Sequence, residues 1–169
     1  MVSLQKGRGI SSNRAGRYEQ WSRVDSDDGW YQESQPSCRT VVETDRSKTS
    51  ITYNRSPDLP FDRSINMYRG CEHGCSYCYA RPTHTYLGYS AGLDFETRLL
   101  FKPDVADQIR REITARSYQC RMIALGANTD PYQPIERQYN LTHQILEVLL
   151  EYRHNQTCLL YTSPSPRDS

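Results

Sequence analysis

The sequence predicts an α/β protein, and two observations carry this prediction. From about Ser64 onward, segments typical of strands alternate with segments typical of helices, in the order strand, helix, strand, helix, strand, helix. The two loops richest in chemically versatile residues, 71–78 and 128–136, each follow a predicted strand. Because α/β folds place their chemistry at the carboxyl ends of parallel strands, this placement favours a sheet or barrel of parallel βα units.

The first elements can be justified in chain order. Residues 65–68 predict a short strand, which the chain can leave sharply at Gly70 because glycine accepts backbone angles that other residues avoid. A helix after the cysteine loop has to accommodate Pro82. Residues 96–102 predict a second strand, which Pro103 ends.

Two longer helices and a third strand follow. Asp104 can cap a helix of roughly 13 residues, in which Val105, Ile109 and Ile113 form one apolar stripe. Residues 122–125 predict a short buried strand. The stripe of the last helix consists of Leu141, Ile145, Leu146, Val148, Leu149 and Tyr152.

Residues 1–50 predict a disordered or loosely packed arm, because they are rich in polar and charged residues and hold no apolar period. Within and beside the arm, Val41-Val42 and residues 50–53 can form short strands. Residues 51–157 form the predicted core.

Charge and hydropathy restrict the partners. The chain of 169 residues has 21 Lys and Arg against 20 Asp and Glu, which leaves a net charge of +1 and no global attraction to nucleic acid or membranes. No apolar run approaches the roughly 20 residues that span a bilayer, and the amino terminus lacks the apolar core of a signal peptide. We therefore expect a cytoplasmic protein without a membrane partner.

Cys71, Cys75 and Cys78 predict a metal site. Three thiols within one short loop, in a chain without a secretion signal, are typical of metal ligands rather than of disulfides. Thiolates select iron–sulfur clusters, zinc or copper(I). A structural zinc and an electron-transfer [4Fe–4S] cluster both usually take four protein ligands, whereas three cysteines leave one iron open to a substrate or cofactor.

Two alternatives use a fourth protein ligand. A zinc-binding interaction module would recruit His73, His84 or Cys120, and a closed electron-transfer cluster would recruit Cys120. We expect His73 to hydrogen-bond nearby instead, and we expect Cys120, which precedes a buried strand, to lie in the core.

At these residues the sequence resembles the radical S-adenosylmethionine (SAM) superfamily, whose signature is Cys-x-x-x-Cys-x-aromatic-Cys with Tyr77 as the aromatic residue. Further matching segments, among them 56–66, 68–82, 92–97 and the Thr-Asp-Pro-Tyr-Gln-Pro-Ile-Glu run at 129–136, resemble an uncharacterised bacterial subfamily related to spore photoproduct lyase. The resemblance covers roughly residues 5–157. It implies the amino-terminal portion of a partial, TIM-like (β/α)6 barrel.

The resemblance also implies a chemistry and its cofactors. A [4Fe–4S] cluster would bind SAM at its open iron and, with an electron from a partner such as flavodoxin or ferredoxin, cleave it to a 5′-deoxyadenosyl radical that takes hydrogen from a substrate. Tyr77 would pack near the adenine, and Thr129 and Asp130 would meet the polar groups of SAM, although this pair also fits a plain turn. The substrate stays open; the relation to spore photoproduct lyase suggests nucleic acid as one class.

Four further residues beside these motifs are candidates for lesser roles. Gln133 and Glu136 follow the same strand end as Thr129 and Asp130. Arg69 and Arg81 flank the cysteines and would meet an anionic substrate, tune the cluster or stay solvated.

Residues 158–169 resemble a translated sequencing adapter rather than protein, and we expect them to be an artefact. The fourth strand expected after the last helix begins where they do. We therefore expect a truncated core of about three βα units, poorly stable and inactive on its own, and a cooperative two-state melt of the chain would contradict this.

Overall fold

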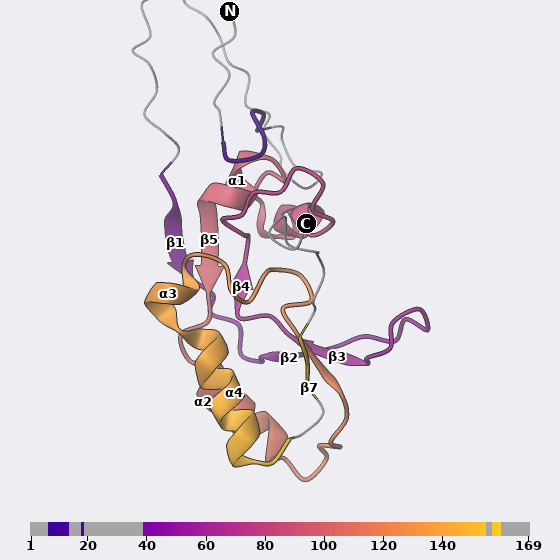
Figure 1. The fold of residues 1–169 in the computed structure, drawn as a ribbon. Helices are drawn as coiled ribbons and strands as arrows, with labels where there is room; N and C mark the ends of the chain where they lie inside the picture. The colour runs from indigo at the N-terminus through magenta and orange to yellow at the C-terminus, as the bar shows by residue number, and fades with distance from the viewer. Residues whose placement is uncertain (1–6, 14–17, 19–38, 155–156, 160–169) are drawn as a thin grey trace, which may run out of the picture.

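A computed structural model describes residues 7–13, 18, 39–154 and 157–159 of the chain (Figure 1). The strands are β1 (Val41–Thr44), β2 (Ile51–Tyr53), β3 (Arg63–Ile65), β4 (Tyr68–Arg69), β5 (Arg98–Phe101), β6 (Ile123–Leu125) and β7 (Thr157–Leu159). The helices are the 3-10 helix η1 (Arg81–Leu87) and the α-helices α1 (Leu93–Thr97), α2 (Val105–Ile113), α3 (Glu136–Tyr139) and α4 (Leu141–Glu151). The predicted α/β class is confirmed.

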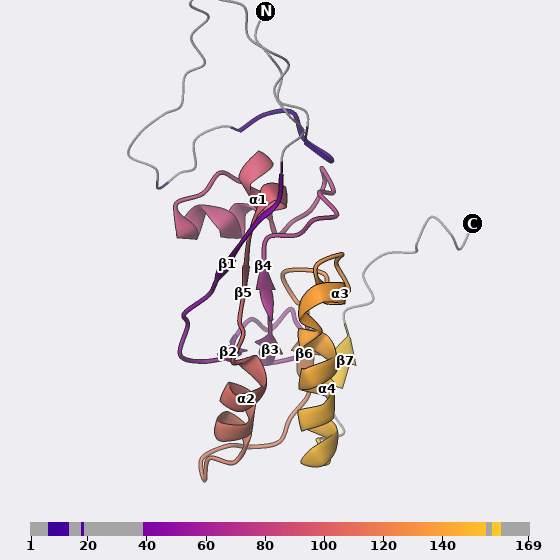
Figure 2. The ribbon, with the colours of Figure 1, turned by 90° about the vertical axis from the view of Figure 1, so that its left-hand side faces the viewer.

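A four-stranded sheet with the order β2-β3-β6-β7 lies below strands β1, β4 and β5 in Figures 1 and 2. β3, β6 and β7 are parallel, and β2 is antiparallel at one edge. Helix α2 lies in the connection from β3 to β6 and α4 in that from β6 to β7, and both cover the same face of the sheet (Figure 2). β7 lies where a strand was expected after the last helix, and two of its three residues, Cys158 and Leu159, belong to the suspected adapter segment.

The predicted strand at 96–102 does not join this parallel sheet. Its structured part, β5, forms a separate sheet of order β1-β5-β4, in which it is antiparallel to β4 and parallel to β1. The single strand predicted at 65–68 is also wrong, because β3 ends at Ile65 and β4 begins at Tyr68 in the other sheet. Strands this short carry too little pattern to encode their partner or direction. Among the described residues, no sheet closes into a barrel.

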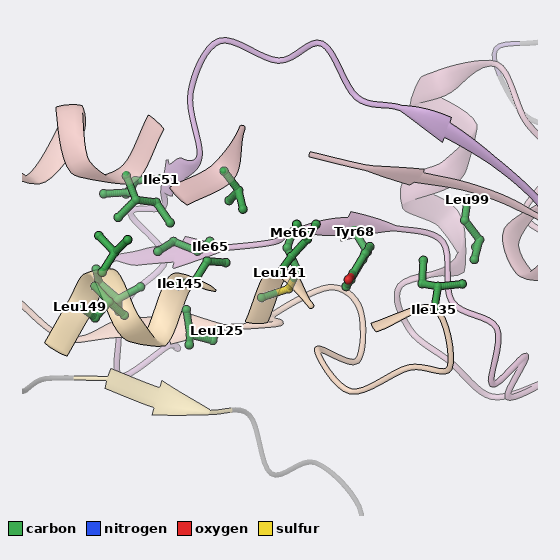
Figure 3. Close-up of a cluster of buried hydrophobic side chains, with 14 residues drawn as sticks. Ile51, Ile65, Met67, Tyr68, Leu99, Leu125, Ile135, Leu141, Ile145 and Leu149 are labelled. Atoms are coloured by element: carbon green, nitrogen blue, oxygen red, sulfur yellow. The ribbon is translucent and has the colours of Figure 1, made fainter. Parts of the chain in front are cut away.

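The hydrophobic core lies between the four-stranded sheet and its two helices. Figure 3 shows Ile65 and Leu125 of the sheet facing Ile145 and Leu149 of α4. Each such side chain stabilises the fold by roughly 1.5–3 kcal/mol when fully buried. The predicted stripes of both helices are buried or partly buried except for Tyr152, which is exposed.

Helix α2 is shorter than expected, with nine residues, and its N-cap Asp104 makes no side-chain capping bond. Apolar burial of one face, rather than the cap, therefore holds this helix. No helix in the part of the chain that the structure describes has both the length and the apolar character needed to cross a bilayer.

Candidate metal centre and adjoining cavity

The cysteine loop follows β4 and contacts α1 through a series of tight turns. The N–H of Cys71 donates to Phe95 O at 2.9 Å, and that of Cys78 donates to Cys75 O at 3.2 Å. Gly74 has φ +64°, and a Cβ on it would lie 2.1 Å from the Glu96 carboxylate. The glycine is therefore required both by the left-handed backbone and by the close approach of Glu96.

The three candidate ligands differ in exposure. Cys71 is buried, while Cys75 and Cys78 are partly exposed. Burial raises the pKa of the Cys71 thiol to about 11. Hydrogen bonds from the backbone N–H groups of His73 and Asp130 to its sulfur act in the opposite direction and lower the pKa. Among the residues that the structure describes, no three His, Cys, Asp or Glu side chains are gathered closely enough to hold a metal ion. The donor set suits a soft metal centre, but the thiols would have to converge on it.

Two of the proposed fourth ligands, Cys120 and His84, lie in settings that differ from those expected. Cys120 is exposed rather than in the core, and it precedes β6, whereas the cysteine loop follows the carboxyl ends of β3 and β4. Its predicted burial was wrong because the apolar run begins only at Ile123. His84 is buried between the rings of Tyr89 and Phe95, and its Nε2 lies 2.9 Å from Arg98 O.

His73 instead joins the cysteine loop to the loop after β6. Its Nε2 lies 3.3 Å from Asp130 Oδ2, and both side chains are half-exposed. The hydrogen bond lowers the pKa of Asp130 and raises that of His73. This contact agrees with the expectation that His73 hydrogen-bonds to a nearby residue.

The other two candidate SAM contacts lie in different environments. Tyr77 is 83% exposed, and its ring is therefore accessible from solvent. Thr129 is buried, and its hydroxyl donates to Tyr68 O at 3.1 Å. The Thr129 oxygen retains lone pairs, but its first role in the structure is to fasten the loop after β6 to β4.

Gln133 is a positioning residue whose importance the sequence did not reveal. It is fully buried; its Oε1 accepts from Glu72 N at 3.0 Å and its Nε2 donates to Gly70 O at 3.3 Å. One amide therefore holds the backbone on both sides of Cys71. Neither periodicity nor spacing could predict this, because the contact joins residues about 60 positions apart.

Glu136 has a structural task. Its carboxylate accepts from the N–H groups of Leu141 and Thr142 at 3.1 and 2.8 Å and from the hydroxyl of Tyr68. It thus caps the start of α4, where a negative charge is favourable.

Arg81 is neither solvated nor free to meet a substrate. It is 5% exposed, and its guanidinium donates to four backbone carbonyls, those of Gly74, Cys75, Ala91 and Gly92. A fifth contact, 3.5 Å long, joins it to the fully buried Glu96 carboxylate. Arg81 therefore braces the cysteine loop against the segment before α1. Sequence spacing could not reveal this, since a cation beside a motif is usually exposed.

Residues 7–13 of the predicted arm also contact this region. The N–H of Gly9 donates to Glu96 Oε2 at 3.1 Å, and Asn13 Nδ2 donates to Asp94 Oδ1 at 3.1 Å. At the other end of the arm, β1 pairs with β5. Residues 1–6, 14–17 and 19–38 of the arm, and residues 160–169 of the suspected adapter, lie outside the described residues.

A hollow of about 610 Å³ opens beside the loop. It lies on the face of the four-stranded sheet opposite the core, because Thr52 and Ser64 line it while their neighbours Ile51 and Ile65 are buried under the helices. Thr129 and Tyr79 line its end nearest the cysteines. A cavity of this size suits a small molecule.

His84 predicts a pH dependence of stability. Burial lowers its pKa from the ordinary value of 6.5. As the pH falls below 6.5, the unfolded chain takes up a proton that folded His84 resists, and the free energy of unfolding decreases. The free energy of unfolding, measured with urea at pH 7.5 and 5.5, should decrease less between these two pH values in His84→Gln than in the original chain. His73 and His154 titrate in both proteins, so their contributions cancel in this difference. An identical decrease in both proteins would contradict the assignment.

Comparison with known proteins identifies relatives without stated functions. The chain is 47% identical over 91 residues to uncharacterized proteins of Mycobacterium tuberculosis and Mycobacterium bovis, covering 54% of this chain and 27% of theirs. It is 31% identical over 103 residues to an uncharacterized protein of Methanocaldococcus jannaschii, covering 60% of this chain and 36% of that one. The chain thus matches about a quarter to a third of the length of these relatives. No protein-family model and no solved structure matches it.

Proposed function

We propose that Cys71, Cys75 and Cys78 hold a [4Fe–4S] cluster with one open iron and that the protein is a radical SAM enzyme. The bound cofactors supply a 5′-deoxyadenosyl radical that takes hydrogen from a substrate. The observation that carries the proposal is the donor set: three thiols on one glycine-turned loop, on which His73, the nearest candidate for a fourth ligand, is bonded to Asp130. That count suits a cluster that binds a cofactor better than a closed zinc or electron-transfer site.

The chain's own residues then hold and shape the loop. Gln133 fixes the backbone on both sides of Cys71, and Arg81 fixes the carbonyls of Gly74 and Cys75. Tyr77, exposed on the same loop, is the proposed adenine contact. Asp130, with Thr129 beside it, is the proposed acceptor for the SAM ammonium group.

The wider assignment follows from the same proposal. The parallel strands β3, β6 and β7 with their two crossover helices would be the first part of a partial (β/α)6 barrel, whose lumen is the cavity side of the sheet. A reduced flavodoxin or ferredoxin would deliver the electron, and the enzyme would work in the cytoplasm.

Anaerobic reconstitution with iron and sulfide tests this proposal. We expect a brown protein with four irons and four sulfides per chain, the composition of one [4Fe–4S] cluster. The matched sample receives zinc instead. A colourless protein that holds one zinc tightly and excludes iron would overturn the cluster and favour an interaction module.

A further inference from the structure

The cavity beside the cysteine loop contains an unusual cation, Lys102. This residue is 6% exposed and lines the cavity at the end of β5. Its ammonium group donates to Thr49 O at 3.1 Å, and among the described residues no carboxylate lies within ion-pair distance of it. An ammonium group has three donors, so two remain available. Burial lowers the pKa of Lys102, although the charges of Asp45 and Glu112 act in the opposite direction.

A second cation, Arg69, lines the same cavity. In the antiparallel pair of β4 and β5, Arg69 lies opposite Leu100, and the N–H of Lys102 donates to Met67 O. The two cations therefore lie on the same face of this pair, because residues two apart on a strand share a face.

Arg69 is only partly neutralised. Its Nε donates to Asp45 Oδ2 at 2.8 Å, and no other acceptor among the described residues takes its remaining N–H groups. Burial disfavours the Asp45 carboxylate, but the bonds from Arg69 and from the Ser47 N–H, together with the charges of Arg69 and Lys102, outweigh burial and lower the pKa of Asp45, so this carboxyl group is charged at neutral pH. Arg69 and Lys102 are the charged residues among those that line the cavity, while the nearby carboxylates of Asp45 and Glu112 do not line it.

We propose that this cavity binds an anionic group of the substrate, a phosphate or a carboxylate, between Lys102 Nζ and the guanidinium of Arg69. That the bound molecule is the substrate rests on the proposed function; the anion site itself does not. An anion would supply the acceptors that the buried ammonium lacks, and charge-assisted bonds of this kind are the strong ones in a low-dielectric site. Arg69 also lies two residues before Cys71, which brings the bound molecule next to the proposed cluster.

Nearby side chains add neutral hydrogen-bonding groups. Asn66 Oδ1 accepts from Asn128 N at 2.8 Å, which leaves the amide N–H groups of Asn66 as donors at the cavity wall. Thr52, Ser64 and Thr83 also line it. The wall is thus cationic at one side, and elsewhere it carries hydroxyl groups together with the apolar side chains of Leu59, Phe61 and Leu87, which suits a small anion with an apolar part.

Thermal unfolding of the chain with added anions tests the site. Inorganic phosphate and acetate are titrated separately against chloride at constant ionic strength, in the original chain, Lys102→Met, Arg69→Gln and the control Lys48→Met. Lys48 is an exposed lysine outside the cavity. We expect phosphate or acetate to raise the midpoint of the original chain and of Lys48→Met, and the more effective anion identifies the group.

Lys102→Met should separate binding from structure. It removes a poorly compensated buried charge, so its midpoint without anion should equal or exceed that of the original chain. The anion should no longer raise the midpoint of Lys102→Met, because its affinity for the anion should fall at least about tenfold. Arg69→Gln should also bind the anion more weakly than the original chain.

Three results would overturn the anion site: no midpoint shift in the original chain, an equal shift in Lys102→Met and Lys48→Met, or an unweakened response in Arg69→Gln. If Lys102→Met fails to fold, the comparison of Arg69→Gln with the original chain still tests the anion site. Iron content measured on parallel samples separates the two proposals. If the anion raises the midpoint but no cluster forms, the anion site is supported and the proposed enzyme is contradicted. If a cluster forms but the anion has no effect, the proposed enzyme is supported and the anion site is contradicted.

Discussion

Replacing Cys71, Cys75 or Cys78 with serine is expected to abolish the iron content and visible absorbance of the reconstituted protein. Each change removes one of three thiolates, and a serine hydroxyl is a poor ligand for iron because it stays protonated near neutral pH. Because the proposed cluster has only three protein ligands, removing any one of them should abolish cluster binding completely rather than partially. Iron and sulfide analysis after desalting, together with the absorption spectrum, measures the effect.

Cys120→Ser provides the matched control. Cys120 is exposed and lies at the other end of the parallel sheet from the cysteine loop, so this variant should keep its iron and its colour. Loss of the cluster in Cys120→Ser would instead favour a closed electron-transfer centre with Cys120 as fourth ligand.

The second large effect concerns Arg81. Arg81→Met keeps the length and apolar stem of the side chain but leaves four backbone carbonyls and the buried Glu96 carboxylate without their partner. Breaking a buried charge pair from one side typically costs about 3–5 kcal/mol, because the remaining charge stays buried. We expect the free energy of unfolding, from urea titration, to fall by this order.

Two comparisons make the Arg81 result specific. The double variant Arg81→Met with Glu96→Gln removes the uncompensated charge and should recover part of the loss. Arg137→Met changes an exposed arginine and should leave stability nearly unchanged. If Arg81→Met were as stable as Arg137→Met, Arg81 would not brace the loop.

The elements that depend on local pattern were predictable from the sequence. The stripe of Val105, Ile109 and Ile113 located α2, and the apolar run before Gly126 located β6, because helix and strand periods are written in neighbouring residues. Both lie close to their predicted ranges. The parallel relation between β3, which ends at the first residue of the strand predicted at 65–68, and β6 also followed from the alternation of elements.

Features that depend on distant contacts were not predictable. The pairing of β5 with β4 and β1 joins short strands far apart in the chain, and such strands do not encode direction. The candidate site shows the same division. The spacing of Cys71, Cys75 and Cys78 marked the proposed metal ligands, but the bracing by Gln133 and Arg81 and the burial of Lys102 required the folded chain.

The most direct test of the central claim is the electron paramagnetic resonance spectrum of the reduced, reconstituted protein with and without SAM. If the three cysteines leave one iron open, SAM will bind there and change the g-values of the signal. A spectrum that SAM leaves unaltered, in a protein with a full complement of iron, would mean that protein groups occupy every iron and would contradict the proposed enzyme.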